Sequence, residues 1–272
     1  MSFTKRTPAA HPQAALVEAA GLQWLKSAEE CGGPAVVDVL DAEPGLLRLQ
    51  EVSTAPPSAA AAAEFGAALA RMHRSLAPET LFGALGPNHP AEQAPLFGPA
   101  DHPLPMGTGQ HRSWGAFHAQ QRLDPVLEGL KSAASSSDWK LLLAARDQIF
   151  SGAYDDDEPP SLIHGDLWSG NVLWSPEGAV LIDPSAHAGH RESDIAMLQL
   201  FGMPHLDELL DAYQQTSALR SGWQQRTAVH QLFYLAVHWL LFGSAYRGPT
   251  LAAAQAAVDP DAHPDAEPNP EV

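Results

Sequence analysis

The chain has 272 residues, 45% of them hydrophobic, which is enough for one large domain or two unequal lobes with a buried core. Its formal net charge is −17, so it should repel nucleic-acid phosphates and attract a cationic ligand. The single cysteine, Cys31, cannot form an intrachain disulfide, which favours a cytoplasmic setting.

The sequence shows no sign of membrane targeting. The opening residues MSFTKRTPAAHPQ lack the apolar core of a signal peptide. The most apolar stretch, residues 232–246, contains a histidine and is shorter than the ~20 residues that a membrane span needs. We therefore expect this stretch to be a core helix, and we expect neither a membrane nor a nucleic acid as a partner.

The N-terminal quarter predicts one helix and a short sheet. Residues 12–30 are typical of a helix, with Pro12 in the first turn and two glycines after the end. Residues 34–40 and 45–52 resemble two short strands. The Pro-containing segment 53–58 then interrupts the pattern, as expected at a lobe boundary.

The remainder is predicted to be mostly helical. Phe65, Leu69 and Met72 form one stripe of a helix that starts at residue 59. A long irregular loop and two more helices should follow, at 77–112, 114–127 and 138–150. Residues 154–160, YDDDEPP, are interpreted as a solvated acidic turn. The expected organisation is an N-terminal lobe at 1–52, a helical lobe at 53–258 and a disordered acidic tail at 259–272.

The segment LIHGDLWSGNVLW, residues 162–174, contains the residues with the clearest chemistry. NVLW and the later AVLI are joined by SPEG, which predicts a β-hairpin. Folding about that turn should bring Asn171 and Asp183 to one end, with Asp166 on the loop that leads there. Paired strands lie ~5 Å apart, so an amide oxygen and a carboxylate there could share one Mg²⁺.

The spacing of these residues indicates phosphoryl transfer. In kinases a catalytic Asp is followed by Asn five residues later and then by a metal-binding Asp. Gly165 in place of an arginine, and Asp-Pro in place of Asp-Phe-Gly, favour small-molecule kinases over protein kinases. In the alternative interpretation, Asp166 and Asn171 only cap turns and Asp183 starts a loop.

A kinase site also needs a cation for the nucleotide phosphates. Glu18 lies within an apolar helical stripe, where a carboxylate is unfavourable unless a charge meets it, and Lys5 is the candidate. In the alternative, Glu18 tilts to the edge of the stripe and Lys5 lies in solvent. Only four residues precede Lys5 here and no GxxxxGK[ST] pattern occurs, so a phosphate-covering loop is absent, supplied by another segment, or encoded upstream.

Several histidines allow more than one interpretation. His164 is expected to brace the loop that carries Asp166. His187 and His190 could suggest zinc, but the Asn–Asp pair suits Mg²⁺ better. His230, Tyr234 and His238 share one helical face that could pack in the core or reach a sugar. Ser193 or Asp194 is interpreted as a helix N-cap. Arg191 and Glu192 receive no role.

These segments resemble the fructosamine kinases, a family within the aminoglycoside and choline phosphotransferase group. The resemblance runs from Phe3 to about residue 247 and is most specific at HGDLWSGN (164–171) and at DPSAHAGHRESDIAM (183–197). It implies an α+β, protein-kinase-like fold with a small, truncated N-terminal lobe. It also implies transfer of the ATP γ-phosphate to the 3-hydroxyl of a ketosamine, either as a small molecule or on a glycated protein.

The resemblance also implies residue roles. Asp166 would be the catalytic base, Asn171 and Asp183 would hold Mg²⁺, Lys5 would bind phosphates and Glu18 would orient it. Gln50, Glu51 and Val52 are the predicted contacts to adenine. Trp168 and His238 are the predicted contacts to the substrate. The alternatives are a kinase for another small alcohol, an ATP-binding pseudokinase, and a zinc hydrolase that uses His164, His187 and His190.

Overall fold

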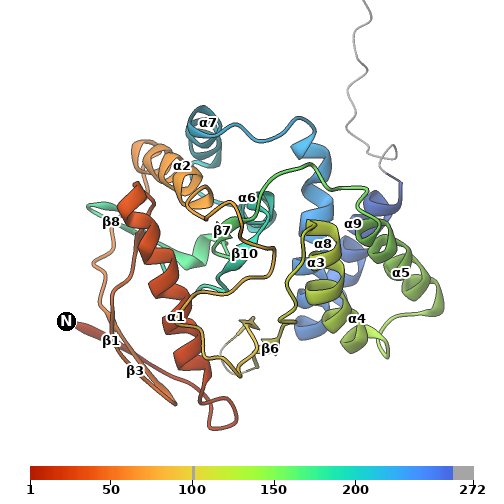
Figure 1. The fold of residues 1–272 in the computed structure, drawn as a ribbon, viewed down its shortest axis with the longest axis horizontal. Helices are drawn as coiled ribbons and strands as arrows, with labels where there is room; N and C mark the ends of the chain where they lie inside the picture. The colour runs from red at the N-terminus through yellow and green to blue at the C-terminus, as the bar shows by residue number, and fades with distance from the viewer. Residues whose placement is uncertain (100–101, 260–272) are drawn as a thin grey trace, which may run out of the picture.

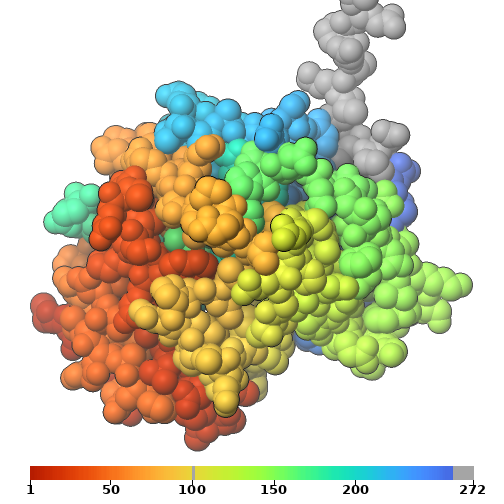
Figure 2. All heavy atoms as spheres, viewed as in Figure 1, coloured from red at the N-terminus to blue at the C-terminus, as the bar shows by residue number. Residues whose placement is uncertain are grey.

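The computed structural model describes residues 1–99 and 102–259. Most of the predicted acidic tail, residues 260–272, lies outside the described residues. Figure 1 shows the N-terminal strands and α1 on one side of the molecule and the helices α3, α4, α5, α8 and α9 on the other. The space-filling view in Figure 2 shows the segment of residues 76–99 lying across the front, between these two parts.

The N-terminal part is a three-stranded antiparallel sheet packed against a helix. The strands β1 (Ser2–Arg6), β4 (Leu46–Gln50) and β3 (Val39–Glu43) run in the order β1-β4-β3. The predicted helix is α1, Ala14–Ser27, followed by a 3₁₀ turn, Ala28–Cys31, that ends at Gly32 with φ 76°. The Ala- and Leu-rich face of α1 packs on β3 and β4, so the apolar stripe seen in the sequence is the face of the helix that contacts the sheet.

The helix α2, Ala59–His73, connects the N-terminal part to the rest. Ser58 caps it by accepting a hydrogen bond from the backbone N–H of Ala61, and the predicted stripe is buried. It packs against α7, Leu206–Thr216. Gly66 makes this approach close, because a Cβ there would lie 2.0 Å from the backbone oxygen of Leu209.

The predicted hairpin is confirmed. It consists of β8 (Val172–Ser175) and β9 (Gly178–Leu181), with Val172 paired to Leu181, and β2 (Ala35–Val36) adds to β9 in parallel. Four further strands form two antiparallel pairs: β7 (Ser161–Ile163) with β10 (His187–Gly189), and β5 (Leu96–Phe97) with β6 (Leu104–Pro105). These two- and three-residue strands carry no alternating pattern, so the sequence did not predict them.

The second part is helical. Its elements are α3 (Trp114–Phe117), a π-helical segment (His118–Leu123), α4 (Asp124–Leu130), α5 (Ser136–Phe150), α6 (Arg191–Phe201), α8 (Trp223–Phe242), a 3₁₀ turn (Ser244–Tyr246) and α9 (Arg247–Val258). The apolar stretch predicted as a core helix falls mainly in α8, which is buried between its neighbours. Among the described helices none is long and apolar enough to cross a membrane.

Apolar packing forms two cores. One joins α1, α2, α7, the N-terminal sheet and the hairpin, and the other joins α3, α4, α5, α8 and α9. The first core therefore extends past the boundary predicted at residues 53–58, because α2 and the hairpin pack with the N-terminal sheet. The loop that carries Asp166 follows β7 and lies close to both cores, since Leu167 belongs to the first and Gly165 lines a small cavity together with Phe97, Trp114 and Phe117 of the second.

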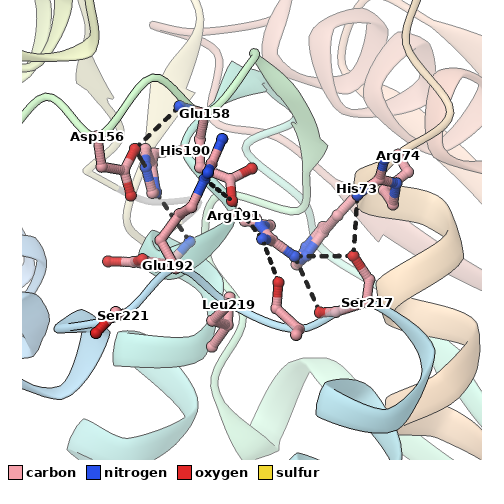
Figure 3. A network of polar contacts seen from close by, with 12 residues as sticks. His73, Arg74, Asp156, Glu158, His190, Arg191, Glu192, Ser217, Leu219 and Ser221 are labelled. Atoms are coloured by element: carbon pink, nitrogen blue, oxygen red, sulfur yellow. Dashed lines mark hydrogen bonds and ion pairs between the residues drawn. The ribbon is translucent and has the colours of Figure 1, made fainter.

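The acidic segment 154–160 is only in part the solvated turn that the sequence suggested, because Asp155 and Asp157 are exposed but Asp156 and Glu158 are not. Asp156 accepts a hydrogen bond from the His190 ring (3.1 Å) and forms an ion pair with Arg226 (2.9 Å), and Glu158 pairs with Arg191, as Figure 3 shows in part. Both carboxylates are largely buried. The interpretation failed because their cationic partners lie more than 30 residues away in the chain and leave no local pattern.

Candidate active site

A cavity of about 550 Å³ lies among β1, α1, the hairpin loops and α8. Side chains from five separate regions of the chain line it, and the predicted Lys5, Glu18, Asp166, Asn171 and Asp183 are all among them. The predicted substrate contacts also line it. The other lining residues are Thr7, Ala14, Val17, Leu96, Phe97, Gly98, Pro99, Pro103, Pro184, Ser185, Met197, Phe201, Val237, Leu241, Phe242 and Tyr246.

The hairpin gathers its three polar residues as the sequence predicts. The Asn171 side-chain nitrogen donates to the backbone oxygen of Asp166 at 2.8 Å and to that of Asp183 at 3.4 Å. The backbone N–H of Ile182 donates to the backbone oxygen of Asn171, which extends the hairpin by one residue pair. Because the Asn171 nitrogen is engaged with the protein, its amide oxygen is the atom left to serve a ligand.

Lys5 and Glu18 form the predicted ion pair. The Lys5 ammonium lies 2.7 Å from a Glu18 carboxylate oxygen and 3.1 Å from one of Asp183. Burial by itself lowers the pKa of Lys5, but attraction to Glu18 and Asp183 outweighs it and raises that pKa above its ordinary value. Lys5 is therefore a fixed positive charge next to the carboxylate at the end of the hairpin.

Glu18 is the partner whose charge is disfavoured by burial. Burial raises its pKa to about 7 against the opposing attraction of Lys5, and its second carboxylate oxygen has no hydrogen-bond partner among the described residues. This carboxylate occupies the apolar stripe of α1 between Ala15 and Leu22, both fully buried. Its charged form thus depends on Lys5.

Asp194 holds the loop that precedes Asp166. This fully buried carboxylate accepts hydrogen bonds from the backbone N–H groups of His164 (2.7 Å) and Gly165 (2.9 Å) and contacts the His73 ring at 3.2 Å. The N-cap of α6 is His190, whose ring accepts from the N–H of Glu192, so the interpretation of Ser193 or Asp194 as the cap is wrong. Because α6 begins at Arg191, Asp194 is its fourth residue and lies one turn too far along the helix to cap it.

Backbone geometry fixes the same loop. Gly165 has φ 80°, and a Cβ there would lie 2.3 Å from the backbone oxygen of Ser185, so only glycine fits. His164 braces the loop as predicted: its ring contacts the Ile182 carbonyl at 2.8 Å and accepts from the N–H of Asp166. Asp183 itself has φ 52°, a left-handed conformation uncommon outside glycine.

Asp166 combines burial with a position on the cavity wall. Desolvation, helped by the nearby Asp183 carboxylate and opposed by a hydrogen bond from the Asn171 side chain, raises the pKa of Asp166 to about 7. A carboxyl group with a pKa near neutrality can both take up and release a proton at physiological pH. Such a group in a cavity is a candidate general base.

Trp168 and His238 also lie where the sequence predicted. Trp168 is 41% exposed on the rim of the cavity, and His238 faces it from α8. The residues predicted to hold adenine are Gln50, the last residue of β4, and Glu51 and Val52 directly after it, and none of them lines this cavity. Their role stays a prediction.

Sequence reasoning missed the aromatic side of the cavity. Phe201, Phe242 and Tyr246 come from the end of α6, the end of α8 and the turn after it. The segment Leu96–Pro99 completes the wall. No pattern in the irregular region 77–112 could have shown this, whereas the run FGSAY at the end of α8 contained an aromatic spacing that was available and unused.

The histidines do not form the zinc site of the hydrolase alternative. Within the described residues, one set of three potential metal ligands comes together, namely His190, Glu192 and His230, with ligand atoms within 4.8 Å. Arg226 already donates to both oxygens of Glu192, and a metal cation there would face this guanidinium. Glu192 is thus already ion-paired with Arg226, and His164 and His187 lie outside this set.

His230 and Tyr234 are core residues, unlike His238. His230 is fully buried, where burial lowers its pKa to about 4, and its ring contacts the Ser193 hydroxyl at 2.9 Å. Of the three-residue stripe on α8, therefore, only His238 reaches the large cavity.

Comparison with known proteins supports this architecture. The sequence matches the fructosamine kinase family over residues 2–258. A probable ketoamine kinase from Enterococcus faecium is 33% identical over 189 residues, which span 67% of this chain and 62% of the relative. The mouse ketosamine-3-kinase is 32% identical over 149 residues, 54% of this chain and 48% of that protein. The matched segments thus span about half to three-fifths of these curated relatives.

Solved structures show the same fold. A fructosamine-3-kinase candidate from Thermobifida fusca superposes with a TM-score of 0.80 at 39% identity, covering 94% of this chain and 85% of that one. An aminoglycoside phosphotransferase in complex with gentamicin superposes with a TM-score of 0.60 over 95% of this chain and 85% of that one, at 10% identity that shows the fold alone. The expected α+β, protein-kinase-like fold is confirmed. Since the family match covers nearly every described residue, the chain belongs to the fructosamine kinase family.

Proposed function

We propose that this protein transfers the γ-phosphoryl group of ATP to a sugar hydroxyl of a ketosamine. The observation that carries the proposal is the meeting of Lys5, Asp166, Asn171 and Asp183 around one cavity, from segments up to 178 residues apart. Phosphoryl transfer needs little covalent chemistry from the protein; it needs charges and oxygen ligands held in position. The family relatives named as ketoamine and ketosamine kinases support the choice of acceptor.

Asp166 would act on the acceptor hydroxyl. Its carboxylate lies on the cavity wall, and its raised pKa matches a group that accepts a proton as the oxygen–phosphorus bond forms. The hydrogen bonds from His164 and Gly165 to Asp194 hold the backbone next to Asp166 rigid. The carboxylate is therefore positioned before the substrate arrives.

Asn171 and Asp183 would hold Mg²⁺. Hard oxygen donors suit this ion, and the Asn171 amide is turned so that its nitrogen bonds the protein and its oxygen stays available. When bound, Mg²⁺ neutralises charge on the transferring phosphate. The residues present therefore fit the group that the fold family uses.

Lys5 would contact the nucleotide phosphates, with Glu18 keeping its ammonium in place. In the structure Lys5 instead pairs with both Glu18 and Asp183. An entering phosphate would compete with Asp183 for Lys5 and leave Glu18 as its anchor. Trp168 and His238 would contact the sugar side, and Gln50, Glu51 and Val52 would contact adenine.

The test is an ADP-release assay with fructose-lysine, comparing the native chain with Asp166→Asn. Asp211→Asn is the matched control, because Asp211 is exposed on α7, away from the cavity. We expect ADP release to need the ketosamine, to fall by about 10³-fold or more in Asp166→Asn, and to persist in the control. Equal rates in Asp166→Asn and the native chain would remove Asp166 from the mechanism. An aminoglycoside or choline as the better acceptor would instead overturn the choice of ketosamine.

A further inference from the structure

On the aromatic side of the cavity only His238 has a task in the proposed transfer, and Phe201, Phe242 and Tyr246 have none. His238 is at its centre, with ring centroids 4.7 Å from Phe201, 5.0 Å from Tyr246 and 5.3 Å from Phe242. Phe242 is 57% exposed, the highest exposed fraction among the aromatic residues that line this cavity. An exposed phenylalanine beside two other rings, those of His238 and Tyr246, at a cavity is typical of a binding surface.

The chemistry of His238 is fixed by its neighbour. Its Nδ1 lies 2.7 Å from the backbone oxygen of Tyr234, and a carbonyl oxygen can only accept a hydrogen bond. Nδ1 therefore carries the hydrogen, and in the neutral ring Nε2 carries a lone pair. Nε2 has no hydrogen-bond partner within the part of the chain that the structure describes. The cavity thus presents one acceptor surrounded by aromatic rings.

The charges that line the cavity favour a cation. Its ionisable lining groups, apart from His238 and Tyr246, are one ammonium, that of Lys5, and three carboxyl groups, those of Glu18, Asp166 and Asp183. The ammonium is already paired with two of the carboxylates. No cationic side chain comes from α6 or α8 among the lining residues. A cation that enters next to the rings is therefore attracted by the carboxyl groups, and the one ammonium that lines the cavity is already paired with two of them.

We propose that His238, Phe242 and Tyr246 form a subsite for the ammonium group that links the sugar of the substrate to its amine carrier. Its N–H would donate to His238 Nε2, and its positive charge would lie against the faces of the rings. The carrier chain would leave over Phe242, toward solvent. This inference rests on the proposed function, because it assumes that the sugar occupies the cavity next to Asp166.

The competing role is a purely apolar wall for the sugar or for the carrier chain. The two roles separate with a matched pair of acceptors, 1-butylamino-1-deoxyfructose and 1-O-butylfructose. These differ only in a cationic NH₂⁺ against a neutral ether oxygen at one position. A subsite for the ammonium group distinguishes them, whereas an apolar wall does not.

The experiment measures KM and kcat for both acceptors by ADP release. The native chain should show a KM about 10-fold lower for the amine than for the ether. Phe242→Leu keeps an apolar side chain but removes the ring, so it should raise the KM for the amine alone, by about 3- to 10-fold, with little change in kcat. Phe242→Tyr should restore the native preference. Phe150→Leu, a change at an exposed phenylalanine outside the cavity, is the control.

Equal KM values of the native chain for the two acceptors would overturn the inference, as would an equal rise for both in Phe242→Leu. Either result leaves the proposed function standing, since both sugars would still be phosphorylated. ADP release with neither acceptor would overturn the proposed function together with this subsite.

Discussion

The substitution Asp194→Asn tests how the candidate site is held together. The Asp194 carboxylate is fully buried and uses one oxygen for the N–H of His164 and the ring of His73, and the other for the N–H of Gly165. Although burial disfavours the charge, the hydrogen bond and attraction from His73, with His164 and Gly165, hold the pKa of Asp194 below its ordinary value. The fold therefore stabilises the ionised form over a neutral one.

The magnitude follows from the geometry. In its better orientation an asparagine keeps its oxygen toward His164 and His73, and its NH₂ group then meets the N–H of Gly165. One charge-assisted hydrogen bond is lost and two donors are left face to face inside the protein. We expect a loss of about 2–4 kcal/mol in the free energy of unfolding.

Denaturant unfolding, followed by circular dichroism, measures this loss, with Asp211→Asn as the isosteric surface control. The same variant should lower kcat for ADP release by about 10- to 100-fold, because Gly165 directly precedes Asp166. A variant that unfolds within about 0.5 kcal/mol of the native chain would refute the assignment of Asp194 as the support of this loop.

Three further outcomes are expected. Lys5→Met should lower kcat/KM for ATP by about 100-fold or more in the ADP-release assay while circular dichroism stays native; an unchanged kcat/KM would separate Lys5 from the phosphates. Burial lowers the pKa of His187 to about 3, below the ~6.5 of an unfolded chain. The neutral ring therefore stabilises the fold fully above pH ~6.5, and this part of the free energy of unfolding declines as the pH falls toward 3. Urea unfolding should show about 2 kcal/mol of this loss between pH 7 and pH 5, and His187→Gln should lack it; equal pH slopes would contradict the burial argument. Gly66→Val should destabilise the protein by about 3 kcal/mol or more, since a side chain there collides with the Leu209 backbone, and a native melting temperature would contradict this contact.

Much of the site could be predicted because its signals are local. The turn SPEG between two β-prone runs fixes the hairpin register, and the register places Asn171 and Asp183 together. The pairing of Lys5 with Glu18 followed from one unfavourable feature, a carboxylate within an apolar helical stripe. In both cases a short stretch of sequence contained the physical reason.

The failures share a different cause. Asp156 and Glu158 appear solvated in the sequence because their partners, Arg226 and Arg191, are distant along the chain. Asp194 appears to be a cap because nothing local shows the two backbone N–H groups that it binds 29 and 30 residues away. Long-range charge pairing leaves no periodicity, so only the folded structure reveals it.

We propose that Asp183 and its neighbours form one magnesium-dependent nucleotide site. The decisive experiment is an equilibrium titration with a non-hydrolysable ATP analogue, first in Mg²⁺ and then in EDTA. We expect at least about 10-fold tighter binding to the native chain and to Asp211→Asn in Mg²⁺ than in EDTA, and the loss of that difference in Asp183→Asn. Equal affinity of the native chain in Mg²⁺ and EDTA, or an undiminished Mg²⁺ effect in Asp183→Asn, would contradict it.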